Sequence, residues 1–155
     1  MSIIDREDIH EQIELAKVVD VENIPYEKLM GVLIGFVYDE LYVKNCFQEL
    51  SIDSKDEAII RNYALRGKAF LNKDLTKEEL TNERISAWTT HDSLIDDSSS
   101  KVLLRIIICL LYDREDAEYD VYGSGEILGV IFSLFLDLGS GYCSRLRHYL
   151  QEKLS

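Results

Sequence analysis

Apolar residues recur at helical spacing along almost the whole chain, and this periodicity limits the fold more than any other feature. Between residues 26 and 50 they occupy positions 26, 30, 33, 37 and 41, which form one face of an α-helix. Runs that alternate apolar and polar residues are missing, as are the Asn-Gly and Asp-Gly pairs that form tight hairpins. The pattern therefore predicts an all-α fold.

Two segments, near 102–112 and 126–138, are apolar on nearly every side of a helix. Such helices need neighbours all round them, so both are predicted to lie at the centre of a bundle. The segment Asp113–Gly125 between them is expected to be an acidic loop. We expect an irregular bundle of about seven helices that forms a single domain over residues 1–155, which is an ordinary domain length.

Two pairs of residues have the spacing of capping boxes, in which a hydroxyl and a carboxylate three residues apart satisfy the first amides of a helix. Ser54 with Glu57 is one pair, and Thr76 with Glu79 is the other. Each pair predicts that a helix begins there.

A long helix is predicted over residues 26–50, with Pro25 in its first turn, where the missing N–H of proline has no cost. Gly31 and Gly35 lie four residues apart in this helix and therefore on the same side of it. This spacing favours close packing of a neighbouring helix over both glycines.

The chain is strongly acidic, with 29 acids, 17 bases and a formal net charge of -12. Residues 1–75 hold fifteen acids and nine bases, and residues 76–155 hold fourteen acids and eight bases, so each half carries -6. The charge therefore belongs to the whole folded surface and not to a tail. Such a surface repels nucleic acid and anionic lipid and attracts cationic partners.

No targeting or membrane segment is predicted. The first fourteen residues are polar and acidic, unlike a secretory signal. The longest apolar runs, Leu29–Tyr38 and Val102–Tyr112, are shorter than the roughly 20 residues that cross a bilayer. We expect a cytoplasmic protein with no membrane partner.

Motifs for catalysis or metal binding are weak. An EF-hand loop that begins at Asp116 would have Val121 where glycine is required and Ile127 where a glutamate is required. Cys46, Cys109 and Cys143 are spaced as isolated buried residues and not as a disulfide framework or a zinc site. We expect no catalytic residue, no metal and no cofactor, with His91 at the border of the core.

Acids and tyrosines alternate closely in residues 112–123, which hold five acids and three tyrosines. Tyrosine offers a large contact area with a polar tip, and carboxylates attract a cationic partner and speed its association. A second acidic group follows Trp88. The candidate partner-binding residues are Asp113, Glu115, Asp116, Glu118, Tyr119, Asp120 and Tyr122, together with Asp92, Asp96 and Asp97.

The size, the charge and the segment 112–122, together with Trp88–Leu94 and the helix that contains Arg105–Cys109, resemble bacterial toxin-immunity proteins, including those of contact-dependent growth inhibition. The resemblance implies an antidote that binds one basic toxin domain, often a nuclease, in a one-to-one complex. It would cover the active-site surface of the toxin, with the acids of 113–120 imitating phosphate charges.

Two other functions stay open at this point. One is a helical metal-dependent hydrolase that uses His91 and Asp92. The other is a regulatory module that forms homo-oligomers through its apolar helices. The bases of residues 61–77 are expected to form a solvated face and not a nucleic-acid site.

Overall fold

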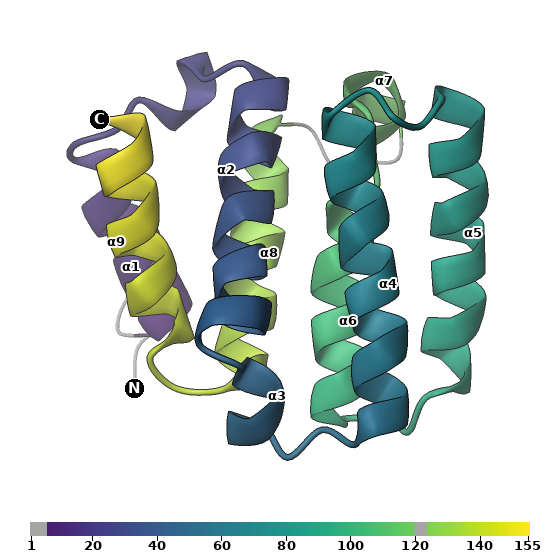
Figure 1. The fold of residues 1–155 in the computed structure, drawn as a ribbon. Coiled ribbons are helices and arrows are strands. Elements are labelled where there is room, and N and C mark those ends of the chain that lie inside the picture. Colours follow the sequence, from purple (N-terminus) through teal and green to yellow (C-terminus); the bar gives the residue numbers. More distant parts are fainter. Residues whose placement is uncertain (1–5, 120–123) are drawn as a thin grey trace.

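A computed structural model gives the fold, and it describes residues 6–119 and 124–155 (Figure 1). These residues form helices and connecting turns, with no strand among them. Among the described residues, seven helices have ten residues or more, as the sequence predicted. The helices are α1 (Glu7–Ala16), α2 (Tyr26–Tyr38), α3 (Cys46–Glu49), α4 (Ser54–Leu71), α5 (Lys77–Ser93), α6 (Ser99–Cys109), α7 (Arg114–Tyr119), α8 (Ser124–Leu138) and α9 (Tyr142–Leu154), with a 3-10 turn at Val21–Asn23 and a π turn at Asp39–Val43.

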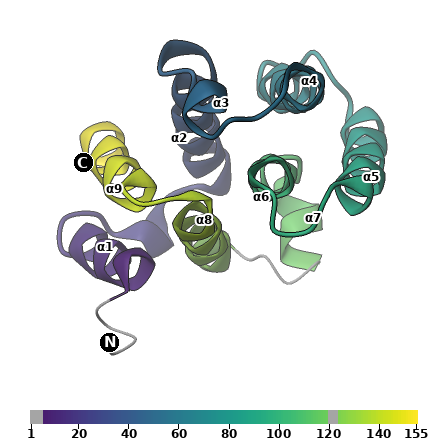
Figure 2. The same ribbon diagram turned by 90° about the horizontal axis from the view of Figure 1, so that it is seen from below.

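The two apolar helices lie at the centre, as expected. α6 packs against α4, α5 and α8, and α8 packs against α1, α6 and α9 (Figure 2). α2 lies between α9 and α4 and contacts both. α6 and α8 therefore join the group formed by α4 and α5 to the group formed by α1 and α9.

The core is almost entirely aliphatic around α6 and aromatic around α8. Phe36 of α2 meets Phe135 of α8 edge to face, with 5.4 Å between the ring centroids. Burial of each large apolar side chain stabilises the folded state by about 1.5–3 kcal/mol. The buried residues of these two central helices include Leu103, Leu104, Ile106, Ile107, Ile108, Ile127, Leu128, Ile131, Phe132 and Phe135.

One of the two predicted capping boxes is confirmed. The Thr76 hydroxyl accepts from the backbone N–H of Glu79, and the Glu79 carboxylate accepts from that of Thr76. The box at Ser54 is wrong, because Asp53 is the N-cap and its carboxylate accepts from Asp56 N–H at 2.8 Å. Aspartate caps at least as well as serine, so the helix begins one residue earlier than the pattern indicates.

The helix predicted over residues 26–50 is interrupted. α2 ends at Tyr38, a π turn follows, and Asn45 has the left-handed conformation, with φ 51°, before α3. Asparagine tolerates this conformation because its short polar side chain can bond locally. In the π turn, Glu40 is buried and accepts from Arg145 Nε of α9 at 3.1 Å. The interruption therefore places a buried carboxylate against its cationic partner.

The acidic loop predicted over Asp113–Gly125 is also wrong in part. Residues 114–119 form α7, and α8 already begins at Ser124. The backbone N–H of Ala117 donates to the carbonyl of Asp113 at 2.9 Å, and Ala117 is fully buried. The buried Ala117 anchors this acidic turn, and α7 contacts α8.

The two glycines of α2 have different surroundings. A Cβ at Gly35 would lie 2.7 Å from the Tyr149 hydroxyl of α9, so close packing of a neighbouring helix is confirmed at this position. A Cβ at Gly31 would meet nothing within 4 Å, so the expectation is wrong there. Gly31 lies in a helix interior without a packing reason, which costs about 0.5–1 kcal/mol relative to alanine.

The substitutions Gly31→Ala and Gly35→Ala should therefore change stability in opposite directions. Gly31→Ala should raise the free energy of unfolding by about 0.5–1 kcal/mol, because the helix gains propensity and nothing is displaced. Gly35→Ala should lower it by about 1 kcal/mol, because Tyr149 must move from its edge contact with Phe36. Urea denaturation of the two matched variants measures both values. Equal changes in the two variants would contradict this account of the helix.

Candidate functional site

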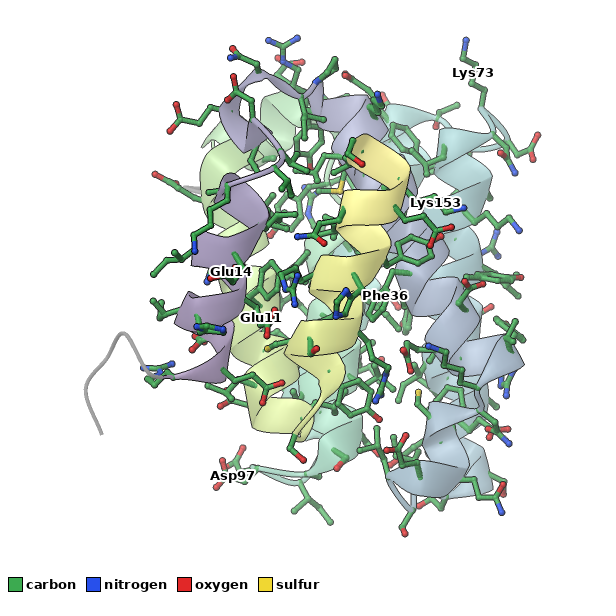
Figure 3. All side chains as sticks on the ribbon, turned by 90° about the vertical axis from the view of Figure 1, so that its left-hand side faces the viewer. Glu11, Glu14, Phe36, Lys73, Asp97 and Lys153 are labelled. Atoms are coloured by element: carbon green, nitrogen blue, oxygen red, sulfur yellow. The ribbon has the colours of Figure 1, made fainter. Side chains whose placement is uncertain are left out.

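The eight predicted partner-binding residues that the structure describes lie at two opposite ends of the bundle. The segment that begins at Asp113 lies at the upper end of the bundle, where α2, α5 and α8 begin (Figure 1). Asp92, Asp96 and Asp97 lie at the lower end, where α5 ends and α6 begins. Fifteen residues of α5 separate Lys77, which contacts Asp113, from Asp92, and this is about 22 Å along the helix axis. Figure 3 shows the same separation between Lys73 above and Asp97 below.

At the upper end, Lys77 lies between two carboxylates. Its Nζ is 2.8 Å from Glu115 Oε2 and 3.6 Å from Asp113 Oδ2. The Glu115 side chain is 83% exposed and the Asp113 side chain 17%, so Glu115 is the one that a partner can reach most easily. Asp116, Glu118 and Tyr119 belong to α7, whereas Asp120 and Tyr122 lie outside the described residues.

Tyr112, the first residue of the tyrosine-rich segment, belongs to the core. It is buried, and its backbone carbonyl accepts from the Tyr26 hydroxyl at 3.0 Å. The guanidinium of Arg84 lies 4.1 Å from the centre of the Tyr112 ring and donates to the carbonyl of Leu111 at 2.9 Å. These contacts hold the chain just before the acidic turn.

An apolar pocket of about 120 Å³ lies beside these acids, between α2, α4 and the end of α6. Residues that are far apart in the sequence line it, among them Met30, Phe70 and Tyr112, with Asp113 next to them. Sequence reasoning missed this pocket and the role of Lys77, because nothing in the local pattern indicates which segments meet. The bases Arg66, Lys68, Lys73 and Lys77 are exposed, as expected, and two of them also form surface ion pairs, Lys77 with Glu115 and Arg66 with Glu83 at 3.4 Å.

The lower end combines exposed acids with an exposed isoleucine. The side chains of Asp92 and Asp96 are 74% and 88% exposed, and Ile95 is 81% exposed. Asp96 accepts from Lys101, and this hydrogen bond lowers the pKa of the Asp96 carboxyl. Asp97 has a positive φ of 61°, which aspartate tolerates in a turn.

His91 borders the core beside Trp88, as the sequence predicted. It is buried, its ring meets Trp88 edge to face at 5.1 Å, and its Nδ1 lies 3.0 Å from Asp92 Oδ1. Among the described residues, no group of three or more His, Cys, Asp or Glu side chains is placed to hold a metal ion. The geometry of His91 is therefore explained by packing and one hydrogen bond.

All three cysteines are buried and unpaired by disulfides. Burial raises the pKa of the thiol from its ordinary 9.0 to about 12 for Cys46, about 11 for Cys109 and about 12 for Cys143. Cys143 also donates to the carbonyl of Phe132 at 3.2 Å. A nucleophilic cysteine needs a thiolate near neutral pH, and these environments oppose its formation.

Comparisons of the chain with family models, with curated proteins and with solved structures found no match. In the described ranges, 6–119 and 124–155, none of the helices combines the length and the apolar character that a bilayer crossing requires. The function is therefore argued from the charges, pockets and contacts of this chain alone.

The raised thiol pKa values predict that the protein loses stability in alkaline solution. Unfolded cysteines ionise near pH 9, whereas the buried ones keep their protons until about pH 11–12. The unfolded state therefore binds fewer protons in this window, and the free energy of unfolding should fall as the pH rises from about 9. Urea denaturation at several pH values measures the fall. The ultraviolet absorbance of thiolate in the native protein provides the control, and a thiolate signal near pH 9 would contradict the assignment.

Proposed function

We propose that this chain is an immunity-type antidote, which binds a basic toxin domain in a one-to-one complex and covers the surface on which that domain acts. The observation that carries the proposal is the acidic upper end, where the exposed Glu115 and the half-buried Asp113 stand beside an apolar pocket. An apolar pocket with charges around it is the usual composition of a protein interface. A nuclease is the toxin class proposed, because its active site must attract phosphate.

The charge of the chain supports a cationic partner. A net charge of -12 creates a field that speeds the approach of a basic protein and repels the nucleic acid that a nuclease would otherwise hold. Carboxylates on α7 would occupy the positions that phosphates take in the toxin. Inhibition would then need no chemistry from this chain, only a stable and correctly charged surface.

The upper end suits this role better than the lower end for a structural reason. Glu115 and Asp113 are held against Lys77, and the chain before them is fixed by Arg84 and Tyr26. A rigid surface loses less conformational entropy on binding than a mobile one. The lower end also has exposed acids and the exposed Ile95. The pocket beside it, however, is lined mainly by charged and polar residues, including His91, whereas the upper pocket is mainly apolar.

The first test is to purify the tagged chain from its native host at low salt and to identify the proteins bound to it. The proposal predicts a small basic protein that dissociates as the salt concentration rises. Once released, this protein should show nuclease or another toxic activity, and one equivalent of the purified chain should abolish that activity. A released partner whose activity is unaffected would contradict the proposal.

The two open alternatives are examined on the same purified chain. A metal-dependent hydrolase would carry divalent metal in an elemental analysis, and its activity would need both His91 and Asp92. A homo-oligomeric module would have at least twice the mass of the chain in solution, without any partner. Either result, together with the absence of a basic partner, would replace the antidote proposal.

The substitutions Glu115→Lys and Asp96→Lys form a matched pair for locating the interface. Each replaces an exposed acid that contacts one lysine, and each changes the net charge by the same amount. Glu115→Lys should slow association with the partner by roughly tenfold, and Asp96→Lys should leave it nearly unchanged. Stopped-flow binding measures the rates, and circular dichroism shows whether the fold is kept. Equal effects would indicate a response to net charge, and an effect of Asp96→Lys alone would place the interface at the lower end.

A further inference from the structure

The apolar pocket at the upper end is built by three helices and opens among charged residues. Its deep part consists of Tyr26 and Met30 of α2 and Tyr112 after α6, all of which are buried. Phe70 and Leu71, in the last turn of α4, are partly buried against the core and form one side. The most exposed residues of the lining are charged, namely Glu27 and Arg114, and Asp113 stands beside them.

The pocket opens to solvent and is large enough to hold an apolar side chain. A volume of about 120 Å³ is roughly four times the share of one water in the liquid, and it is close to the ~150 Å³ of an apolar cavity that binds benzene. The pocket can therefore accept one branched aliphatic side chain of the size of leucine.

The charges around the opening determine which residues of the partner can flank that side chain. Glu27, Asp113 and Glu115 carry negative charge at the upper end, and Lys77 and Arg114 offset part of it. An incoming apolar residue is therefore favoured when lysines or arginines flank it, and disfavoured when acids do.

We infer that this pocket is the socket for an apolar anchor residue of a basic partner, with cationic residues beside the anchor pairing with the acids of α7. The inference rests on the proposed function and makes it more specific, because it states what the partner must present. A central apolar residue in a desolvated pocket, surrounded by charges, is where binding energy is concentrated in protein complexes.

The test uses short synthetic peptides, so it does not need the natural partner. The probe is an acetylated and amidated pentapeptide with one leucine between two pairs of lysines. Two matched peptides replace the leucine by alanine or the four lysines by glutamates. Met30 lines the socket and is one of two methionines in the chain, so the NMR signal of its methyl group reports occupancy.

The lysine–leucine peptide should shift the Met30 methyl signal and bind at least about tenfold more tightly than the alanine peptide, because a buried leucine side chain is worth that much or more. The glutamate peptide should produce no shift. Equal binding of the leucine and alanine peptides would show that charge alone acts, and equal binding of the lysine and glutamate peptides would show that the socket does not select a basic partner. Either result overturns the inference, as does a Met30 signal that changes with protein concentration alone, which would indicate a second copy in the socket.

Met30→Trp fills the socket, and Gly31→Trp places the same ring on the next residue of α2, in open space outside it. With the amide signal of Gly67 as the reporter, Met30→Trp should weaken binding of the leucine peptide about tenfold and Gly31→Trp should not. The same variants can be tested with the natural partner. If Glu115→Lys loses binding and Met30→Trp keeps it, the socket is rejected but the antidote proposal stands. A chain that has no basic partner but binds the leucine peptide would reject the antidote proposal and keep the socket.

Discussion

The burial of α6 on nearly all sides is the constraint on which the rest of the structure depends. Leu103, Leu104, Ile106, Ile107 and Ile108 occupy more than half of the circumference of the helix, and each is at most 2% exposed, whereas Val102 and Arg105 on the remaining side are partly buried. α4, α5 and α8 must therefore surround it. α6 also ends in the interior, where the carbonyls of Ile107 and Ile108 accept from the backbone N–H groups of Leu110 and Leu111, and the buried carbonyls that follow need other partners.

The carbonyl groups of two residues that follow α6 connect the core to the candidate site. The carbonyl of Leu111 accepts from Arg84 of α5, and the carbonyl of Tyr112 accepts from Tyr26 of α2. Because a buried carbonyl without a partner is costly, these two side chains are held where they are. Tyr26 also lines the pocket, and Asp113 follows directly after the second of these carbonyl groups. The site at the upper end is thus a consequence of how α6 ends.

The sequence predicted those parts of the structure that depend on neighbours along the chain. Helical spacing, the Thr76 capping box and the apolar character of the two central helices are local properties, and each was confirmed. How the two predicted acidic groups lie relative to each other could not be predicted, because residue type does not determine position: Asp92 and Asp113 lie at opposite ends of α5. The pocket could not be predicted because α2, α4 and α6 form it jointly, and no pattern within one segment indicates that contact.

Part of the negative charge of the chain stabilises the helices themselves. α2, α5 and α8 all begin at the upper end, and their first turns contain Glu27, Glu78 and Glu79, and Glu126. A helix start carries roughly half a positive charge, which these acids partly neutralise, so the field they project into solvent is weaker than their number suggests. Glu115 lies in the first turn of the short α7, is 83% exposed and pairs with Lys77 at the start of α5. The exposed carboxylate of Glu115 and the apolar pocket are neighbours because the chain just after α6 leads into α7 and also lines the pocket with α2 and α4.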